Sequence, residues 1–225
     1  GERSATLLSD GSPVTIGAIE KMSKSKLNVV DPDDILSHYG ADTARWFMLS
    51  DSPPERDVIW TEAGAEGAGR FVQRLWRIIT DAKELLGDKS VKEPKNFSEQ
   101  ALELRKAAHK ALDNVSGDIE ALRFNRAVAQ IYEFTNTLSS ALANARKEEK
   151  SELPADMAFA LNEATTFLIT LFGPMMPHLA EECWAHMGNR EILAKTPWPD
   201  VNKSLLKEDS ITIAVQVNGK RDRKS

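Results

Sequence analysis

The sequence predicts a mainly α-helical fold, an antiparallel bundle of helices, and three observations lead to that prediction. Apolar residues recur at intervals of three and four along four long segments, which places them on one face of each helix. Glycines, prolines and charged runs separate those segments. The chain has 225 residues and is 41% hydrophobic, which is enough to bury a core against which such faces can pack.

The elements before the bundle are short. Residues 1–20 mix Gly, Ser and Pro with β-branched pieces and predict a loop with one brief strand. Asp31 is a candidate N-cap and Pro32 suits the first helical position, so a helix is expected there, ending at Gly40. A second short helix is expected over 42–52, where a Ser-Pro-Pro sequence ends it.

Four amphipathic helices follow, each with its own apolar stripe. The first helix is expected to end at Gly87. Asn96 and Glu99 are expected to cap the second helix, and the fourth is expected to lie between Pro154 and Gly173. Four residues of the second helix are expected to lie off its stripe, namely Lys106, His109, Lys110 and Asp113. The stripes are Phe71, Leu75, Ile78, Ala82 and Leu85, then Leu104, Ala108, Leu112, Val115 and Ile119, then Phe124, Val128, Ile131, Thr135, Leu138 and Leu142, then Met157, Leu161, Ala164, Leu168 and Leu171.

The last stretch of the chain changes its pattern. A short fifth helix is expected after Pro177, and apolar residues then alternate with others over 211–217, as in a half-buried strand. We therefore expect three regions: residues 1–60, the end of one domain with connecting helices; residues 61–200, the bundle; and residues 201–225, a linker and the start of a truncated α/β domain. A start at Gly rather than Met and an abrupt end after the strand favour a piece of a longer protein.

Composition excludes several classes of protein. The net charge of −5 provides no overall positive field, so any RNA binding must depend on local basic faces. The single cysteine, Cys183, excludes a disulfide framework and a Cys-rich zinc site, and we expect no metal site. No apolar run approaches the roughly 20 residues needed to cross a bilayer. We expect a cytoplasmic protein with no membrane association, and a monomer.

The strongest local motif is a lysine-rich loop at residues 21–25. Lys21 and Lys24, with Lys26 next to the motif, supply three ammonium groups within six residues, which suits a polyphosphate. Ser23, Ser25 and exposed backbone N–H groups can add hydrogen bonds to phosphate oxygens. Charge alone leaves open the alternative that this is an ordinary solvated basic loop.

The order of residues around this loop resembles a known family. The string K-M-S-K-S, followed by K-x-N-x-V-x-P and later by G-A-D-T-A-R, is similar to the signature loop of class I aminoacyl-tRNA synthetases. The resemblance implies the KMSKS region of a Rossmann catalytic domain that binds ATP, with Mg²⁺ carried by the nucleotide, forms an aminoacyl-adenylate and transfers the acyl group to tRNA. A His-Ile-Gly-His element is missing from the chain, so we expect no adenylation by this piece alone.

The same resemblance implies roles for the five residues of the motif. It makes Lys24 the residue that contacts ATP and stabilises charge on the β and γ phosphates as pyrophosphate leaves. Lys21 supports the same phosphates or the loop. Ser23 and Ser25 shape the loop and add hydrogen bonds, and Met22 anchors it by packing. The loop is expected to close over ATP and reopen.

Several junction segments favour the bacterial leucyl branch of this family, which implies leucine, ATP and tRNA(Leu) as partners. The segments are Asp51–Trp60, Glu66–Trp76, Phe124–Ile131, Pro174–Trp184 and Val215–Lys220. The tail from Arg221 to Ser225 fits the family pattern poorly. Two alternatives stay open: a valyl or isoleucyl relative, and a non-enzymatic helical RNA-binding module in which K-M-S-K-S is incidental.

One helix surface is a candidate for RNA. Arg70, Arg74 and Arg77 recur at helical spacing on the first long helix and can hold phosphates, although a solvated face explains the spacing equally well. The resemblance favours tRNA. Weaker candidates of the same kind are Arg123, Arg126 and Arg146.

The remaining notable side chains are expected to be structural. Helical register predicts core positions for the aromatic residues Trp76, Phe124, Phe172 and Trp184 rather than base stacking. His178 is expected to cap or pack, and Cys183 to be a small buried hydrophobe. His109 and His186 have no companion residues that suggest a metal.

Overall fold

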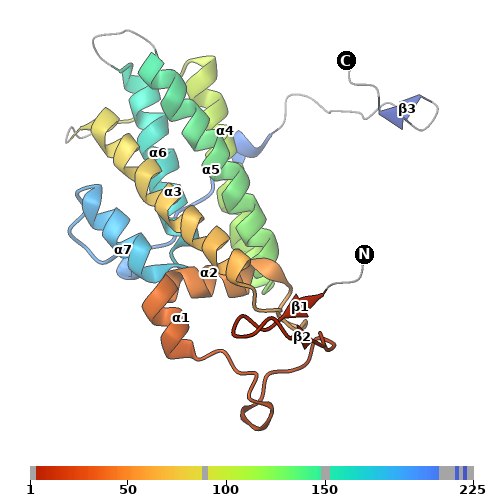
Figure 1. Cartoon of the computed structure of the whole chain (residues 1–225). Coiled ribbons are helices and arrows are strands. Elements are labelled where there is room, and N and C mark those ends of the chain that lie inside the picture. Colours follow the sequence, from red (N-terminus) through yellow and green to blue (C-terminus); the bar gives the residue numbers. More distant parts are fainter. Residues whose placement is uncertain (1–3, 88–90, 148–152, 208–215, 218–219, 222–225) are drawn as a thin grey trace. The chain divides into compact units, whose positions relative to one another are not determined.

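The chain is described from a computed structural model, which covers residues 4–87, 91–147, 153–207, 216–217 and 220–221. These residues are mainly helical, as the sequence predicts (Figure 1). The contacts of the chain divide it into two compact units, Gly1–His38 and Tyr39–Ser225. The tripartite division at residues 60 and 200 stays a prediction.

The first unit contains little regular structure. Strand β1 (Ala5–Thr6) pairs antiparallel with β2 (Pro13–Val14), so the strand expected here has a partner. A 3-10 turn, η1 (Lys24–Lys26), follows in the lysine-rich loop, and α1 (Pro32–Tyr39) begins where predicted. The Asp33 backbone N–H donates to Asp31 Oδ1 over 2.9 Å, which confirms the predicted cap.

The second unit contains the predicted bundle. Helices α4 and α5 pack against each other and against α6, and α3 contacts α5, α6 and α7 (Figure 1). The four predicted long helices are therefore confirmed, as are the short helices before and after them. The bounds are α2 (Ala41–Asp51), α3 (Glu62–Leu86), α4 (Glu99–Glu120), α5 (Phe124–Lys147), α6 (Ala155–Phe172) and α7 (Pro177–His186), followed by the 3-10 turns η2 (Leu193–Lys195) and η3 (Lys203–Leu206).

The core of the second unit is built from the predicted apolar stripes. Every stripe residue is buried except four at helix ends, which are half-buried: Leu85, Ile119, Phe124 and Met157. Helix α6 is buried on more than one face, because it contacts α3, α4, α5 and α7. Phe172 is fully buried, and Trp76 and Trp184 pack half-buried against the core, which confirms their structural role.

Two sequence predictions for α4 are wrong. Its N-cap is Ser98, whose Oγ accepts from the Ala101 N–H, and not Asn96. The Ser98 backbone N–H is held by Asp156 of α6 over 2.8 Å, a tertiary contact that helical spacing does not reveal. His109, expected to lie off the stripe, is only 3% exposed because partners from two distant segments enclose it.

The C-terminal strand prediction falls mostly outside the described residues. Strand β3 (Gln216–Val217) covers its last two positions and pairs antiparallel with β4 (Lys220–Arg221), while residues 211–215 are not described.

Among the helices that the structure describes, none combines the length and the apolar character needed to span a bilayer.

Candidate functional site

The lysine-rich loop of the first unit is closed by the side chain of Asn28. The Ser23 backbone N–H donates to Asn28 Oδ1 over 2.8 Å, and Asn28 Nδ2 donates to the Lys21 carbonyl over 3.5 Å. Inside this closure, the Lys26 N–H donates to the Ser23 carbonyl and the Leu27 N–H to the Lys24 carbonyl. The motif is therefore a compact turn and not an extended segment.

Two of the three ammonium groups in the loop remain available to an anion. Lys26 is paired with Glu20, which removes one of them. Lys21 and Lys24 are exposed, and the described residues provide neither with an ion pair. The hydroxyl oxygens of Ser23 and Ser25 lie 3.3 Å apart on the same turn. The loop thus presents two cations and two hydroxyl groups, a set suited to phosphate oxygens.

The packing role expected for Met22 stays a prediction. Its side chain is 43% exposed, and none of the described residues 4–38 is buried. The first unit therefore offers no core of its own into which a methionine could pack. The other four predicted loop residues, Lys21, Ser23, Lys24 and Ser25, are brought together by the turn.

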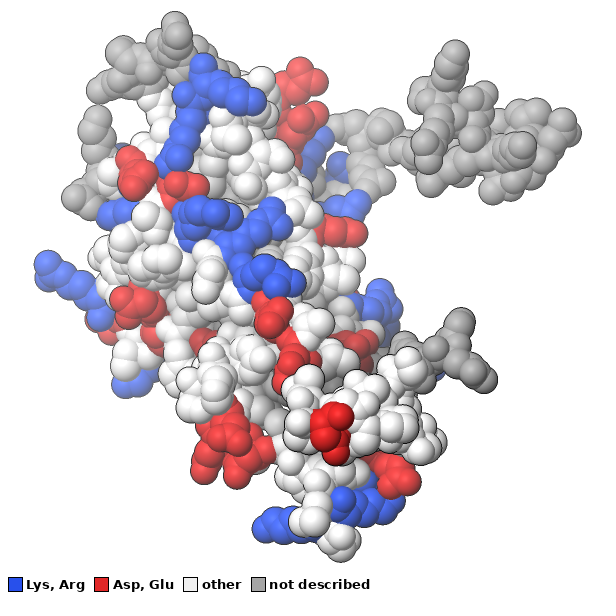
Figure 2. Space-filling model, viewed as in Figure 1, with Lys and Arg blue, Asp and Glu red and all other residues white. Residues whose placement is uncertain are grey.

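The predicted basic face forms on α3. Figure 2 shows Lys and Arg side chains gathered over the middle of this helix, between acidic side chains toward its two ends. Arg77 is exposed, and Arg70 is exposed with a long contact of 3.6 Å to Glu66. Arg74 Nη2 donates to Asn136 Oδ1 of α5 over 2.7 Å, which orients its guanidinium along the seam between the two helices. The three arginines share one solvent-facing surface.

The weaker arginine candidates have acidic partners. Arg123 and Arg126 both contact the buried carboxylate of Asp118, at 3.2 and 3.5 Å. Arg146 pairs with Asp81 at 2.9 Å and with Glu84 at 3.1 Å. Since these carboxylates offset their charge, the three residues attract phosphate less strongly than the middle of α3 does.

A buried polar cluster between α4 and α6 was missed at the level of sequence. Arg105 donates from Nε and Nη2 to the two carboxylate oxygens of Glu163, at 2.8 and 3.0 Å, and also contacts Glu93. His109 Nε2 lies 3.4 Å from Glu163 Oε1, while His109 Nδ1 accepts from the Asn202 backbone N–H. The sequence did indicate that Arg105 is buried, because Arg105 lies four residues after Ala101 and three before Ala108, on the apolar stripe itself.

These contacts set the charge states within the cluster. Burial raises the pKa of Glu163, but hydrogen bonds from His109 and Arg105 and the charge of Arg105 together leave that pKa below its usual value. The hydrogen bond with Glu163 raises the pKa of Arg105. The cluster is therefore a stable ion pair whose groups bond to one another, which indicates a structural role.

A second missed contact joins α2 to α7. Asp42, which is 8% exposed, accepts a hydrogen bond from the Leu179 backbone N–H over 2.6 Å and lies 2.9 Å from His178 Nδ1. An aspartate of the G-A-D-T-A-R string therefore caps the first turn of α7 from another helix. His178 contacts this cap.

Cys183, further along α7, is buried as predicted, and burial together with Glu182 raises its pKa to about 12.

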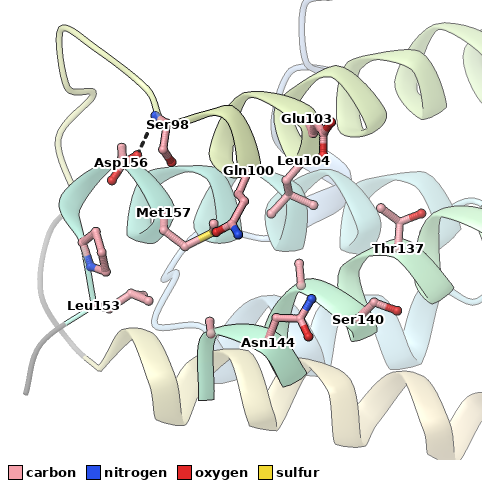
Figure 3. Close-up of a pocket in the computed structure, with 13 residues that line it drawn as sticks. Ser98, Gln100, Glu103, Leu104, Thr137, Ser140, Asn144, Leu153, Asp156 and Met157 are labelled. Carbon is pink, nitrogen blue, oxygen red and sulfur yellow. Dashed lines mark hydrogen bonds between the residues drawn. The ribbon is translucent and has the colours of Figure 1, made fainter. Parts of the chain in front are cut away.

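Of the hollows on the second unit, the one between α4, α5 and α6 shows no catalytic arrangement, and a second contains Asp42 and His178, the residues at the cap of α7. Figure 3 shows one of about 520 Å³ between α4, α5 and α6, with Asp156 at one end and Thr137 at the other. Its polar lining consists of Ser, Thr, Asn, Gln, Asp and Glu side chains, without histidine, cysteine or lysine, and Asp156 is already bonded to Ser98. No group of three metal-ligating side chains occurs within the described ranges. The loop and the α3 face remain the two candidate sites.

Comparison with protein families accounts for the loop and for the helices that follow α3, while α3 itself lies between the two matched ranges. Residues 101–224 match the model of the anticodon-binding domain of tRNA ligase. The chain belongs to this family. Residues 13–61, which include the lysine-rich loop, match the model of class I tRNA synthetases of the I, L, M and V type. The bundle and the loop therefore carry two separate family signatures in one chain.

Curated relatives favour the leucyl branch of the family. A leucine–tRNA ligase of Rhodopseudomonas palustris (strain CGA009) is 58% identical over 97% of this chain, and one of Parvibaculum lavamentivorans is 56% identical over 98%. These matches confirm the resemblance that the junction segments indicate. The chain spans 24% of the length of each of these relatives.

Solved structures agree with this family assignment. The LeuRS in a LeuRS–tRNA–LeuAMS ternary complex from Agrobacterium radiobacter K84 matches 90% of this chain with a TM-score of 0.73 and 30% identity, over 25% of its own length. A free methionyl-tRNA synthetase of Mycobacterium tuberculosis matches 69% of this chain, over 34% of its own, with a TM-score of 0.54 and 21% identity. The second likeness shows a shared fold alone.

Proposed function

We propose that this chain is a segment of a leucine–tRNA ligase, which activates leucine with ATP and transfers it to tRNA(Leu). The observation that carries the proposal is the 58% identity to a leucine–tRNA ligase over 97% of the chain, including the segment with the lysine-rich loop. In this proposal the chain supplies the ATP-binding KMSKS loop and helices that bind tRNA.

The loop is assigned the handling of phosphate. Lys24 places its ammonium against the β and γ phosphates and stabilises the charge that develops as pyrophosphate leaves. Lys21 supports the same phosphates, and Ser23 and Ser25 donate hydrogen bonds to their oxygens. The exposure of both lysines and the pairing of Lys26 with Glu20 support this division of roles. Mg²⁺ would arrive with the nucleotide.

The first unit is assigned to the edge of a Rossmann catalytic domain, within residues 1–60 of the chain. Its apolar side chains support this assignment, because Leu8 and Ile19 are 105% and 79% exposed. Apolar surface left in water is unfavourable, so these residues suit a contact with further protein. The two other regions, residues 61–200 and 201–225, are assigned to the tRNA-binding bundle and the start of an α/β domain.

The basic face of α3 is assigned to tRNA. Arg70, Arg74 and Arg77 lie on one surface, as contacts to successive phosphates require. Phosphate contacts orient the RNA and carry no base information, so the face positions tRNA without reading its sequence. Arg123, Arg126 and Arg146 are assigned a minor role because carboxylates already hold them.

The first test is Lys24→Ala in the full-length protein that contains this chain. Leucine-dependent exchange of pyrophosphate into ATP should fall by about 10² to 10³-fold, the usual effect of removing one preorganised transition-state contact. Lys195→Ala, at an exposed lysine on η2, is the matched control and should leave exchange unchanged. Exchange that survives Lys24→Ala at the control level would contradict the role of Lys24.

The same assay separates the alternatives. Exchange supported by valine or isoleucine in preference to leucine would favour another branch of the family. A full-length protein that supports exchange with no amino acid, and yet binds RNA, would favour the non-enzymatic helical module.

A further inference from the structure

Asn28 lies outside the K-M-S-K-S pentapeptide but bonds to its first and third residues. Its amide oxygen accepts from the Ser23 N–H at 2.8 Å, and its amide nitrogen reaches the Lys21 carbonyl at 3.5 Å. One side chain therefore ties the backbone on either side of Met22. Lys26 and Glu20 form a second tie across the same loop.

The turn inside this closure contains an unfavourable backbone conformation. Leu27 ends η1 with φ 54° and ψ 31°, the left-handed region that side chains with a Cβ avoid. The Leu27 side chain is 93% exposed, so packing does not offset the strain. Hydrogen bonds must therefore hold the turn. The Lys26 and Leu27 N–H groups donate to carbonyls inside it, and Asn28 adds side-chain bonds to Lys21 and Ser23.

From this geometry we propose that Asn28 is a positioning residue for adenylate formation. Its amide holds the backbone of Lys21 and Ser23 in place, and through them the turn that carries Lys24. The inference rests on the proposed function, because it concerns the geometry in which the loop meets the phosphates of ATP. Asn28 touches no substrate in this scheme and acts through the lysines.

The expected kinetic effect follows from this role. Charge that develops on the leaving pyrophosphate requires cations at fixed positions, whereas ground-state ATP tolerates a looser arrangement. Loss of the closure should therefore lower kcat more than it raises the KM for ATP. The hydrogen bonds are exposed, so the melting temperature should not change.

The experiment measures leucine-dependent pyrophosphate exchange in the full-length protein. Asn28→Ala should lower kcat by about 10 to 100-fold, the scale of a small misplacement of catalytic groups, with a smaller change in the KM for ATP. Asp10→Ala is the control, because Asp10 makes the same kind of bond, to the Ser12 N–H at 2.9 Å, in a different turn of the same unit.

The outcomes separate this inference from the proposed function. Wild-type protein without leucine-dependent exchange would contradict the proposed function itself. Active wild-type protein in which Asn28→Ala keeps its kcat, or changes only the KM for ATP, would overturn the positioning role and leave the function intact. Equal losses in Asn28→Ala and Asp10→Ala would also overturn it.

Discussion

Arg105 is a charged residue in the middle of an apolar stripe, and its contacts explain how the core of the bundle tolerates it. Its side chain is 8% exposed and that of Glu163 is 12% exposed. The guanidinium lies 4.3 Å from the ring centroid of Phe97 and 5.0 Å from that of Phe159. Two charge-assisted hydrogen bonds and two aromatic rings therefore replace the water that Arg105 lost on burial.

A prediction at the residue scale follows from this pair. Arg105→Met should lower the free energy of unfolding by about 3–5 kcal/mol, because it leaves the Glu163 carboxylate buried without its main partner. Urea unfolding of the 225-residue chain measures the change. Arg126→Met, at a half-exposed arginine 3.5 Å from Asp118, is the control and should cost less than about 1 kcal/mol.

The double variant Arg105→Met with Glu163→Leu provides the decisive comparison. It removes both charges, so most of the stability lost in Arg105→Met should return. A double variant no more stable than Arg105→Met would show that packing around the guanidinium, and not the buried carboxylate, sets the cost.

Asn28 illustrates how far residue patterns inform the candidate site. The types and spacing of Lys21, Ser23, Lys24 and Ser25 indicated phosphate chemistry, and the turn gathers them as expected. The role of Asn28 in closing the loop was not foreseen, because a side-chain bond to a backbone amide five residues earlier depends on the shape of the turn. The packing of Met22 stays a prediction, since none of the described residues 4–38 is buried within this chain.

The contact of α2 with the first turn of α3 depends on a glycine. A Cβ placed on Gly64 would lie 2.4 Å from Phe47 Cε2 and 2.7 Å from Thr61 Oγ1. Neither neighbour moves easily, because Phe47 is 5% exposed and Thr61 is the N-cap that accepts from the Gly64 N–H. Because Gly64 has no side chain, the Thr61 cap and the Phe47 ring can both pack against this position.

The element-scale prediction compares two helical glycines. Gly64→Ala should lower the free energy of unfolding by about 1–3 kcal/mol through overpacking. Gly117→Ala in α4 should raise it by about 0.5–1 kcal/mol, because alanine favours the helix and its Cβ meets nothing within 4 Å. Urea denaturation of both variants checks the opposite signs. If Gly64→Ala were as stable as Gly117→Ala, the close approach of Phe47 would be disproved.

Helix ends show where tertiary contacts modify local rules. The cap of α1 at Asp31 follows from sequence, because its partner is two residues away. The N-cap of α4 is Ser98 and not the predicted Asn96, and the Ser98 backbone N–H donates to Asp156 of α6. The first turn of α7 depends on Asp42 of α2, a partner 137 residues from Leu179. Local capping patterns therefore predict a helix end only when its partners are also local.

Charge at the scale of the molecule is distributed unevenly despite the net value of −5. The Lys and Arg side chains over the middle of α3 form a row with acidic groups toward its ends (Figure 2). Other arginines of the bundle are held by Asp118, Asp81 and Glu84. Binding of a polyanion therefore depends on the local balance of cations and carboxylates more than on the total charge.

The corresponding prediction concerns the salt dependence of tRNA binding. For the double variant Arg70→Gln with Arg77→Gln, the slope of log K against log salt concentration should become shallower by about 1–2, since each lost phosphate contact contributes about 0.9. Filter binding of tRNA(Leu) to the chain at several salt concentrations measures the slope. Arg123→Gln with Arg126→Gln is the matched control and should change it less, because Asp118 already pairs with both side chains. An unchanged slope in the α3 variant would contradict the tRNA role proposed for this face.

The sequence alone determined the four long helices, their breaks and the cation-rich loop. These are local properties, since a stripe with a period of 3.6 residues or a lysine cluster exists before any two distant segments meet. Tertiary structure decided that α6 would be buried by four other helices, that Arg105 would meet Glu163, and that α3 would keep its arginines exposed. The physical reason is that burial and ion pairing depend on partners far away in the chain, as in the separation of 58 residues between Arg105 and Glu163, which no local pattern specifies.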